Sequence, residues 1–373
     1  MSGATTTSVD HTWSVDWPLY SCDDHLDLWA LPPDLWAARL PRRQRDRGPR
    51  VVEIDGAPMW TAEGNVIGIS GRPPAGRHSA LARAGHGNDG FRPSNPKQRL
   101  EDMDRDGVCA SVIYGPNVLG LPIGDPELKA ACWRAWNDWA TEFNSFAPDR
   151  LAVLPVLPTH EPAAAAEELV RVAESGHRGA LVYCFEFDCG DQQWDVLWSA
   201  AQETNLPISF HIGGGVTIPV QQKSWRTMAF SAVVPMQLCQ PFATMIYCGA
   251  LERHPGMKLV LAEAGLGWIP YLLHRMNATA ARWSGVATDY ALSTIPSELF
   301  DNQVYVTFED EAMAATHVGA IGPDRCMWAS DYPHVDSTFP HSIEAIRQSF
   351  GALPPDVCRA ITADNCRALY GFA

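Results

Sequence analysis

The sequence predicts an α/β fold, specifically a (β/α)8 TIM barrel with a long insertion after the first strand. Short apolar runs typical of strands alternate with longer amphipathic runs typical of helices. Most of the strand-like runs are apolar throughout, which is expected for parallel strands that are buried on both faces. Eight such units are enough to close a barrel. A doubly wound sheet is the alternative, but it would carry a Gly-rich phosphate turn after an early strand, and none is present.

The elements follow one another in a regular order. The predicted strands are residues 21–25, 109–114, 151–157, 179–184, 207–211, 257–263, 303–308 and 326–330. The predicted helices are residues 126–144, 162–174, 193–203, 225–252, 270–283, 312–318, 342–350 and 356–370. This order predicts a single domain over residues 1–373, because each predicted strand except the first is followed directly by a helix.

One region breaks the alternation. Residues 39–96 are rich in Gly, Pro and Arg and show little periodicity. They lie between the first and second strands, so on a barrel they would form a long loop at the catalytic face. A linker is one interpretation. We favour a lid or pocket wall, since long loops in compact domains are usually functional or disordered.

Composition narrows the class of protein. The 373 residues are 46% hydrophobic, and the formal charge of -15 argues against nucleic acid as a partner. No apolar run approaches the roughly 18 residues that a membrane helix needs, and residues 1–16 lack a signal-peptide pattern. The 10 cysteines include no C-x-x-C pair. We therefore expect a cytoplasmic protein without disulfides or a membrane partner.

The last predicted strand carries the most informative residues. Its apolar run ends on Ser330-Asp331, and Pro333 then stops strand pairing because proline lacks the backbone donor. Asp331 would thus lie at the carboxyl end of a strand, with His334 just beyond it. In α/β folds chemistry is built at that end. A helix cap is the alternative reading of Asp331.

Three other predicted strands end in similar residues. Asp23 and His25 are two apart on the first strand, so both face the barrel interior. His211 ends the fifth strand before a run of three glycines, and Glu263 ends the sixth. Alone, each could be a cap, a core histidine or a salt-bridge partner. Together they would converge at one mouth, where imidazoles and carboxylates suit Zn, Fe(II) or Mn(II).

These residues resemble the amidohydrolase-related family, the branch of the amidohydrolase superfamily that includes aminocarboxymuconate semialdehyde, resorcylate and carboxyvanillate decarboxylases. The likeness runs from about Ser21 to Phe372. The motifs that carry it are Cys22-Asp23-Asp24-His25, Arg99-Leu100-Glu101-Asp102-Met103-Asp104, Phe210-His211-Ile212-Gly213-Gly214, Leu261-Ala262-Glu263-Ala264-Gly265 with Trp268-Ile269-Pro270, Ser330-Asp331-Tyr332-Pro333-His334, and Asn365-Cys366-Arg367-Ala368-Leu369-Tyr370-Gly371.

The resemblance implies a barrel with a metal held by Asp23, His25, His211 and Asp331. Two departures stand out. The first strand carries Asp-x-His where many members have His-x-His or Glu-x-His. The sixth carries Glu263 where the decarboxylases have a catalytic histidine. Glu263 could bind a second metal or act as a base, as in the dinuclear iron thioesterases of actinobacterial natural-product pathways, which this chain also resembles.

We therefore expect a metal-dependent hydrolase that cleaves an acyl bond (thioester, ester or amide) with metal-activated water. One or two ions of Fe, Zn or Mn would generate hydroxide, and Asp331, His334 and Glu263 would carry the catalysis. The substrate would be a small acyl or carboxylate compound. Members of this family are often dimeric, which leaves a homodimer open.

Two alternatives to the hydrolase remain. One is a metal-dependent decarboxylase of an aromatic or enolic acid, in which a protein acid protonates carbon. The other is a barrel that only binds a ligand; it is disfavoured because clustered inward charge is costly without an ion.

Overall fold

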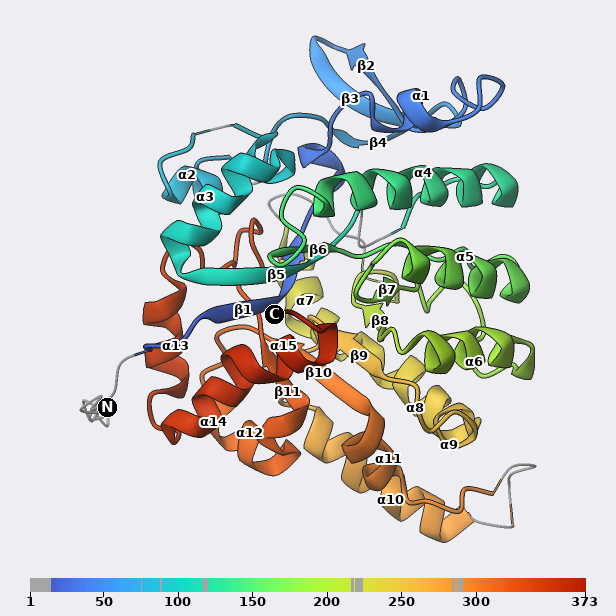
Figure 1. Cartoon of the computed structure of the whole chain (residues 1–373), viewed down its shortest axis with the longest axis vertical. Helices are drawn as coiled ribbons and strands as arrows, with labels where there is room; N and C mark the ends of the chain where they lie inside the picture. Colours follow the sequence, from blue (N-terminus) through green and yellow to red (C-terminus); the bar gives the residue numbers. More distant parts are fainter. Residues whose placement is uncertain are drawn as a thin grey trace.

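A computed structural model describes residues 15–74, 76–87, 89–116, 120–215, 218, 224–283, 286 and 291–373 (Figure 1). Within these residues, eight parallel strands alternate with helices. They are β1 (Leu19–His25), β5 (Val108–Tyr114), β6 (Leu151–Val153), β7 (Ala180–Leu181), β8 (Ile208–His211), β9 (Leu259–Ala262), β10 (Val304–Phe308) and β11 (Cys326–Trp328).

The eight strands close into a barrel through two seams. Strand pairing gives the orders β1-β5-β6 and β11-β10-β9-β8-β7. The first seam joins β6 to β7, where Leu181 N donates to Pro155 O at 2.8 Å. The second joins β11 to β1, where Asp331 N donates to Asp23 O at 3.0 Å and His25 N donates to Tyr332 O at 2.7 Å. The predicted (β/α)8 barrel is confirmed.

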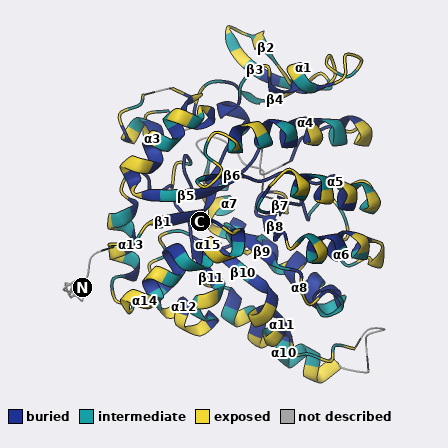
Figure 2. Ribbon diagram, in the orientation of Figure 1, coloured by how far each residue is buried: buried dark blue, intermediate teal, exposed yellow. Residues whose placement is uncertain are grey.

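Helices surround the barrel, and Figure 2 shows that their outer faces are exposed while the strands inside are buried. Three predicted helices have the predicted bounds: α4 (Pro126–Asn144), α5 (Pro162–Glu174) and α13 (Ser342–Phe350). The other helices are α1 (Leu35–Arg39), α2 (Ala80–Arg83), α3 (Pro96–Asp106), α6 (Asp195–Thr204), α7 (Trp225–Val233), α8 (Cys239–Tyr247), α9 (Ala250–Arg253), α10 (Ile269–Trp283), α11 (Pro296–Gln303), α12 (Ala314–Ile321), α14 (Pro355–Arg359) and α15 (Asn365–Tyr370).

The predicted helix over 225–252 is interrupted. A 3-10 segment that contains Pro235 separates α7 from α8, and Gly249, with a φ of 78°, separates α8 from α9. Proline removes a helical donor, and a left-handed residue ends a helix. The stretch Trp225–Tyr247 is long and apolar enough to cross a membrane by length and composition, and 33% of its most apolar window is buried. By this criterion the segment departs from the prediction that no such stretch exists, but the core helices of soluble proteins meet the criterion as well.

The insertion after β1 is more ordered than its composition predicts. It holds an antiparallel sheet of β2 (Arg50–Ile54), β3 (Ala57–Ala62) and β4 (Asn65–Ile69), which lies beside α4 at the top of Figure 1. Trp36 joins it to that helix, since its ring contacts Trp60 at 5.2 Å and its Nε1 donates to Cys132 O at 3.0 Å.

Further along the insertion, Arg83 in α2 binds the loop that follows β11. Its guanidinium donates to Val335 O at 2.6 Å and to Ser337 O at 2.9 Å. These contacts attach the insertion to the loop that carries His334. Whether residues 39–96 act as a lid stays a prediction.

Asp24 stabilises the seam between β1 and β11. It points away from the face that carries Asp23 and His25, because side chains alternate along a strand. Its carboxylate accepts hydrogen bonds from Ser21 Oγ at 2.8 Å, Ser330 Oγ at 2.7 Å and the Ser111 hydroxyl, and it pairs with Arg99 at 3.3 Å. These partners come from β1, β5, α3 and the end of β11, so the buried charge ties the seam together.

Candidate functional site

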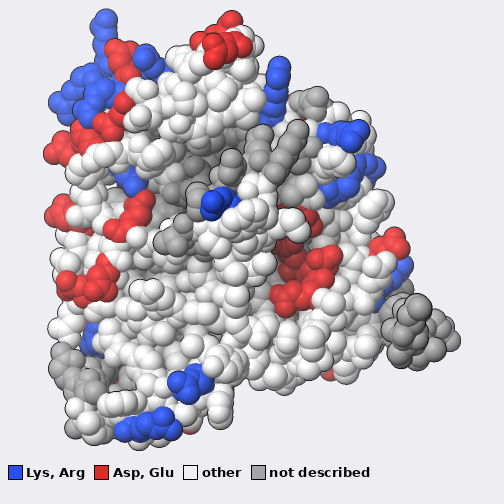
Figure 3. All heavy atoms as spheres, turned by 180° about the vertical axis from the view of Figure 1, so that it is seen from behind, with Lys and Arg blue, Asp and Glu red and all other residues white. Residues whose placement is uncertain are grey.

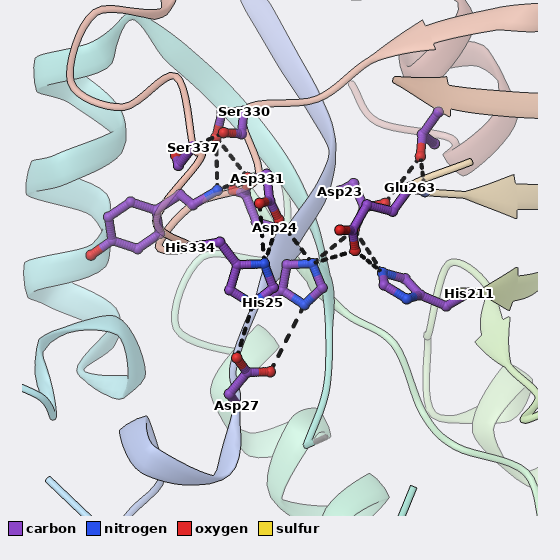
Figure 4. Close-up of polar contacts among 12 residues, drawn as sticks. Asp23, Asp24, His25, Asp27, His211, Glu263, Ser330, Asp331, His334 and Ser337 are labelled. Carbon is purple, nitrogen blue, oxygen red and sulfur yellow. Dashed lines mark hydrogen bonds and ion pairs between the residues drawn. The ribbon is translucent and has the colours of Figure 1, made fainter. Parts of the chain in front are cut away.

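The structure brings all six predicted site residues together at the carboxyl ends of the strands (Figure 4). Asp23 and His25 come from β1, His211 from β8, and Glu263 directly follows β9. Asp331 and His334 follow β11. Two overlapping groups can each hold a metal ion by the spacing of their donor atoms: His25, Glu263, Asp331 and His334, and Asp23, His25 and His211.

The donor atoms lie close together around His25 and His211. His25 Nε2 is 3.0 Å from Asp331 Oδ1, 3.3 Å from Asp23 Oδ1 and 3.8 Å from Glu263 Oε2. His211 Nε2 is 3.4 Å from Asp23 Oδ1 and 3.3 Å from Glu263 Oε2. Two ligands about 2.1 Å from one ion lie about 3.0–3.4 Å apart in tetrahedral or octahedral geometry. Most of these separations fit that spacing.

Hydrogen bonding also fits a metal. Among the described residues, four buried atoms of this cluster that could bind a metal have no hydrogen-bond partner: Asp23 Oδ1, His25 Nε2, His211 Nε2 and Asp331 Oδ1. Buried polar atoms are rarely left unpaired, because the loss of solvation is costly. His211 Nδ1 lies 2.8 Å from Ile212 O and can donate to it. That bond would leave Nε2 as the lone-pair nitrogen, the form that binds a metal.

The charges of the site favour a cation. Burial raises the pKa of Glu263 to about 7, with the negative charge of Asp331 adding to the effect. Burial alone would also raise the pKa of Asp331, but His334 and His25 outweigh it and lower the pKa. For His25, burial and His334 lower the pKa, yet the nearby carboxylates of Asp23 and Asp331 raise it to about 10. The carboxylates of the cluster thus favour a positive charge among them.

An unusual backbone conformation orients two of the carboxylates. Glu263 and Asp331 have φ values of 52° and 57°, in the left-handed region that residues other than glycine seldom occupy. Each such conformation costs on the order of 1–3 kcal/mol and persists only where surrounding contacts hold it. Here Glu263 N donates to Thr307 Oγ1 at 2.7 Å, and Asp331 N donates to Asp23 O.

Asp27 is a site residue that the sequence analysis missed. His334 Nε2 lies 2.9 Å from Asp27 Oδ2, and His334 Nδ1 lies 2.9 Å from Asp331 Oδ1. The His334 ring stacks on His25 with centroids 3.9 Å apart. Asp27 follows β1 by two residues, in phase with Asp23 and His25, and this spacing is the signal that could have identified it. His334 is therefore held between two carboxylates.

A cavity of about 510 Å³ opens over the cluster. Glu263 and His334 belong both to its lining and to the cluster. Its apolar wall includes Ile212, Phe230 and Phe308. A cavity of this size is typical of small-molecule sites. None of the described residues that line it comes from the insertion at 39–96.

Three acidic residues after β10 also line this cavity: Glu309, Asp310 and Glu311. Asp310 and Glu311 precede the next helix without joining its first turn, because α12 begins only at Ala314. Glu309 was missed altogether. Glu186, which follows the predicted strand at 179–184, lies in a different pocket, where it pairs with Lys129 and accepts from Thr159 Oγ1 at 2.6 Å.

Comparison with known proteins points to one group of enzymes. A family model described as "Amidohydrolase" matches residues 74–372. Gamma-resorcylate decarboxylase of a Rhizobium species is 26% identical over 259 residues, which cover 63% of this chain and 76% of that protein. The chain also resembles the crystal structure of an amidohydrolase from Mycobacterium avium subsp. paratuberculosis, with a TM-score of 0.79, 21% identity, and coverage of 96% of this chain and 100% of the other.

A third similar protein is 5-carboxyvanillate decarboxylase from Novosphingobium aromaticivorans, solved in complex with manganese. Its TM-score is 0.69 at 15% identity, and the match covers 95% of this chain and 96% of the other. Further relatives and structural neighbours are also decarboxylases. These findings contradict the predicted hydrolase and thioesterase activity and favour the decarboxylase alternative. With a family model matched over most of its length, the chain belongs to the amidohydrolase family.

Proposed function

We propose that this protein is a metal-dependent, non-oxidative decarboxylase of an aromatic or enolic carboxylic acid. The observation that carries the proposal is the cluster of unpaired imidazole and carboxylate atoms next to a ligand-sized cavity, which Glu263 and His334 of the cluster line. The decarboxylases among its relatives and structural neighbours support the choice of reaction.

In this proposal Asp23, His25, His211 and Asp331 would hold the divalent ion. Mixed nitrogen and oxygen donors suit Mn, Fe or Zn, and manganese is present in structures of two similar decarboxylases. When bound, the ion would act as a Lewis acid that binds the substrate carboxylate and a neighbouring oxygen. The protein's own side chains would supply the proton and position the substrate.

Glu263 is our candidate for the proton donor. Loss of carbon dioxide leaves an electron pair on the carbon, and a proton must reach that atom to complete the product. Glu263 lines the cavity as well as the cluster, so its carboxyl group can face both the ion and the substrate. It would replace the histidine that the family resemblance leads us to expect at this position.

His334 and the apolar wall would position the other groups. Because both of its ring nitrogens lie beside carboxylates, His334 would orient Asp331 rather than contact the reacting carbon. Phe230 and Phe308 would pack on the flat substrate and exclude water from the carbon that loses its carboxylate.

The test is carbon dioxide release by manganese-loaded protein from a panel of hydroxybenzoates that includes 2,6-dihydroxybenzoate. In D2O each turnover should place one deuterium on the vacated carbon. Glu263→Gln should lower kcat by about 100-fold or more, the usual effect of losing a general acid. Glu186→Gln, a matched change in a different pocket, should have a small effect. Manganese-loaded protein that releases no carbon dioxide from any member of the panel would refute the proposal.

A further inference from the structure

The cavity over the cluster carries an unusual excess of negative charge. Five acidic residues line it: Glu263, Glu309, Asp310, Glu311 and Asp336. None of the described lining residues is Lys or Arg. Figure 3, which views the molecule from the side opposite to Figure 1, shows Asp and Glu side chains gathered in a hollow of that face. An acid that enters this cavity must tolerate the negative charge.

Two of these carboxylates already have protein partners. Glu311 Oε1 accepts from Leu266 N at 2.7 Å, and its other oxygen lies 3.7 Å from His317. Glu263 faces the imidazoles of His25 and His211. Neither is therefore free to pair with the far end of a substrate.

Glu309 and Asp336 form no hydrogen bond or ion pair with any other side chain in the described part of the chain. Asp336 is exposed at the rim, whereas Glu309 is partly buried. A partly buried carboxylate without a partner is costly, and a cation placed beside it would remove that cost.

A divalent ion does not neutralise the site. One such ion offsets the charges of Asp23 and Asp331, so with Glu263 protonated as the proposed donor a bound substrate carboxylate leaves the site negative. The carboxylates of Glu309 and Asp336 line the same cavity but belong to neither group of candidate ligands. The cavity therefore favours a positive charge at the end of the substrate that is remote from the reacting carboxylate.

We propose that the substrate carries an ammonium group on the end remote from its reacting carboxylate, and that Glu309 and Asp336 bind this group. The inference rests on the proposed function and names the substrate class: an aromatic or enolic acid with a primary aminoalkyl substituent. The apolar wall packs on its ring, while a second carboxylate at the remote end is excluded by repulsion from the same side chains.

The experiment compares three 2,6-dihydroxybenzoates that differ only at the 4-position: aminomethyl, ethyl and carboxymethyl. For the manganese-loaded protein at low salt, kcat/KM should be about tenfold higher for aminomethyl than for ethyl, and about tenfold lower for carboxymethyl, as one hydrogen-bonded charge pair gives. Glu309→Gln should reduce the aminomethyl-to-ethyl ratio at least fivefold. Asp324→Asn is the matched control, because it removes one charge before the amino end of β11, away from the cavity.

Calorimetric binding of the three compounds to the same protein separates this inference from the decarboxylase proposal. Tighter binding of the aminomethyl compound that depends on Glu309, without carbon dioxide release from any compound, supports the charge preference and refutes decarboxylation of this series. Carbon dioxide release without a preference for the aminomethyl compound overturns the inference alone. Tightest binding of the carboxymethyl compound also overturns it.

Discussion

Thr307 on β10 donates a hydrogen bond from its hydroxyl to Asp23 Oδ2 on β1, at 3.0 Å, although β11 lies between these two strands. The Thr307 hydroxyl oxygen in turn accepts a hydrogen bond from Glu263 N at 2.7 Å. One buried hydroxyl thus orients a candidate ligand from one strand and supports the left-handed backbone of a carboxylate on another. Replacing partners of this kind typically lowers metal affinity by about 10–100-fold.

Replacing Thr307 by valine should therefore weaken metal binding. The change keeps the shape but removes the donor to Asp23 and the acceptor for Glu263 N. We expect manganese affinity, measured by competition with a chelating dye, to fall about 10–100-fold. Thr307→Ser keeps the hydroxyl and serves as the control. Equal affinity in the valine and serine variants would contradict this role.

Metal removal should destabilise the protein. Without an ion, the carboxylates of Asp23, Glu263 and Asp331 repel one another, and a ligand that binds only the folded state stabilises it. Manganese at about 100 times Kd should add about 2.7 kcal/mol to the free energy of unfolding, seen as a higher Tm than in chelator-treated protein. Asp331→Asn should lose most of this increase. Asp195→Asn, outside the site, should keep it.

Arg99 should be essential for stability because it pairs with the buried Asp24. Arg99→Met leaves that carboxylate without its positive partner, which we expect to cost about 3–5 kcal/mol in urea unfolding. Combining it with Asp24→Asn should recover part of the loss, since the two changes act on one interaction. Arg105→Met is the control on the same helix, where the side chain is exposed. A loss in Arg99→Met no larger than in the control would show that the pair contributes little.

His177 should make stability depend on pH. Burial is the main cause that lowers its pKa to about 4, from about 6.5 in the unfolded chain. Below pH 6.5 the unfolded state takes up the proton first, so stability is lost as pH falls from about 6.5 to 4, by about 1.4 kcal/mol per pH unit. The stability difference between the wild type and His177→Gln should thus shrink by about 2 kcal/mol between pH 7 and pH 5. A difference that stays constant with pH would contradict the assignment.

The insertion shows where local signals were available but overlooked. Asp55-Gly56 and Glu63-Gly64 both have positive φ values, as two-residue hairpin turns require. An Asp-Gly pair between β-prone runs is a strong hairpin signal, and it is printed in the sequence. The high Gly, Pro and Arg content of residues 39–96 favoured an irregular loop instead. Overall composition does not record which residues stand next to each other at a turn.

The sequence by itself determined the barrel and most of its candidate site. Apolar runs that end in Asp, His or Glu are local features, and parallel strands necessarily bring their carboxyl ends to one mouth. Asp23, His25, His211 and Asp331 could therefore be placed together before any coordinates. The reaction was not determined in this way: Glu263 favoured hydrolysis on sequence grounds, whereas the relatives favour decarboxylation.

Only the tertiary structure decided how these groups are oriented and what surrounds them. Thr307 looks like an ordinary strand residue, and Glu309 is one of three consecutive acidic residues with no distinguishing spacing. Their roles depend on distances across the barrel to Asp23 and to the cavity, between residues far apart in the chain. Such contacts follow from strand register and barrel closure, which no single segment encodes. The orientation of the ligands and the charge of the cavity therefore emerge only when the barrel closes.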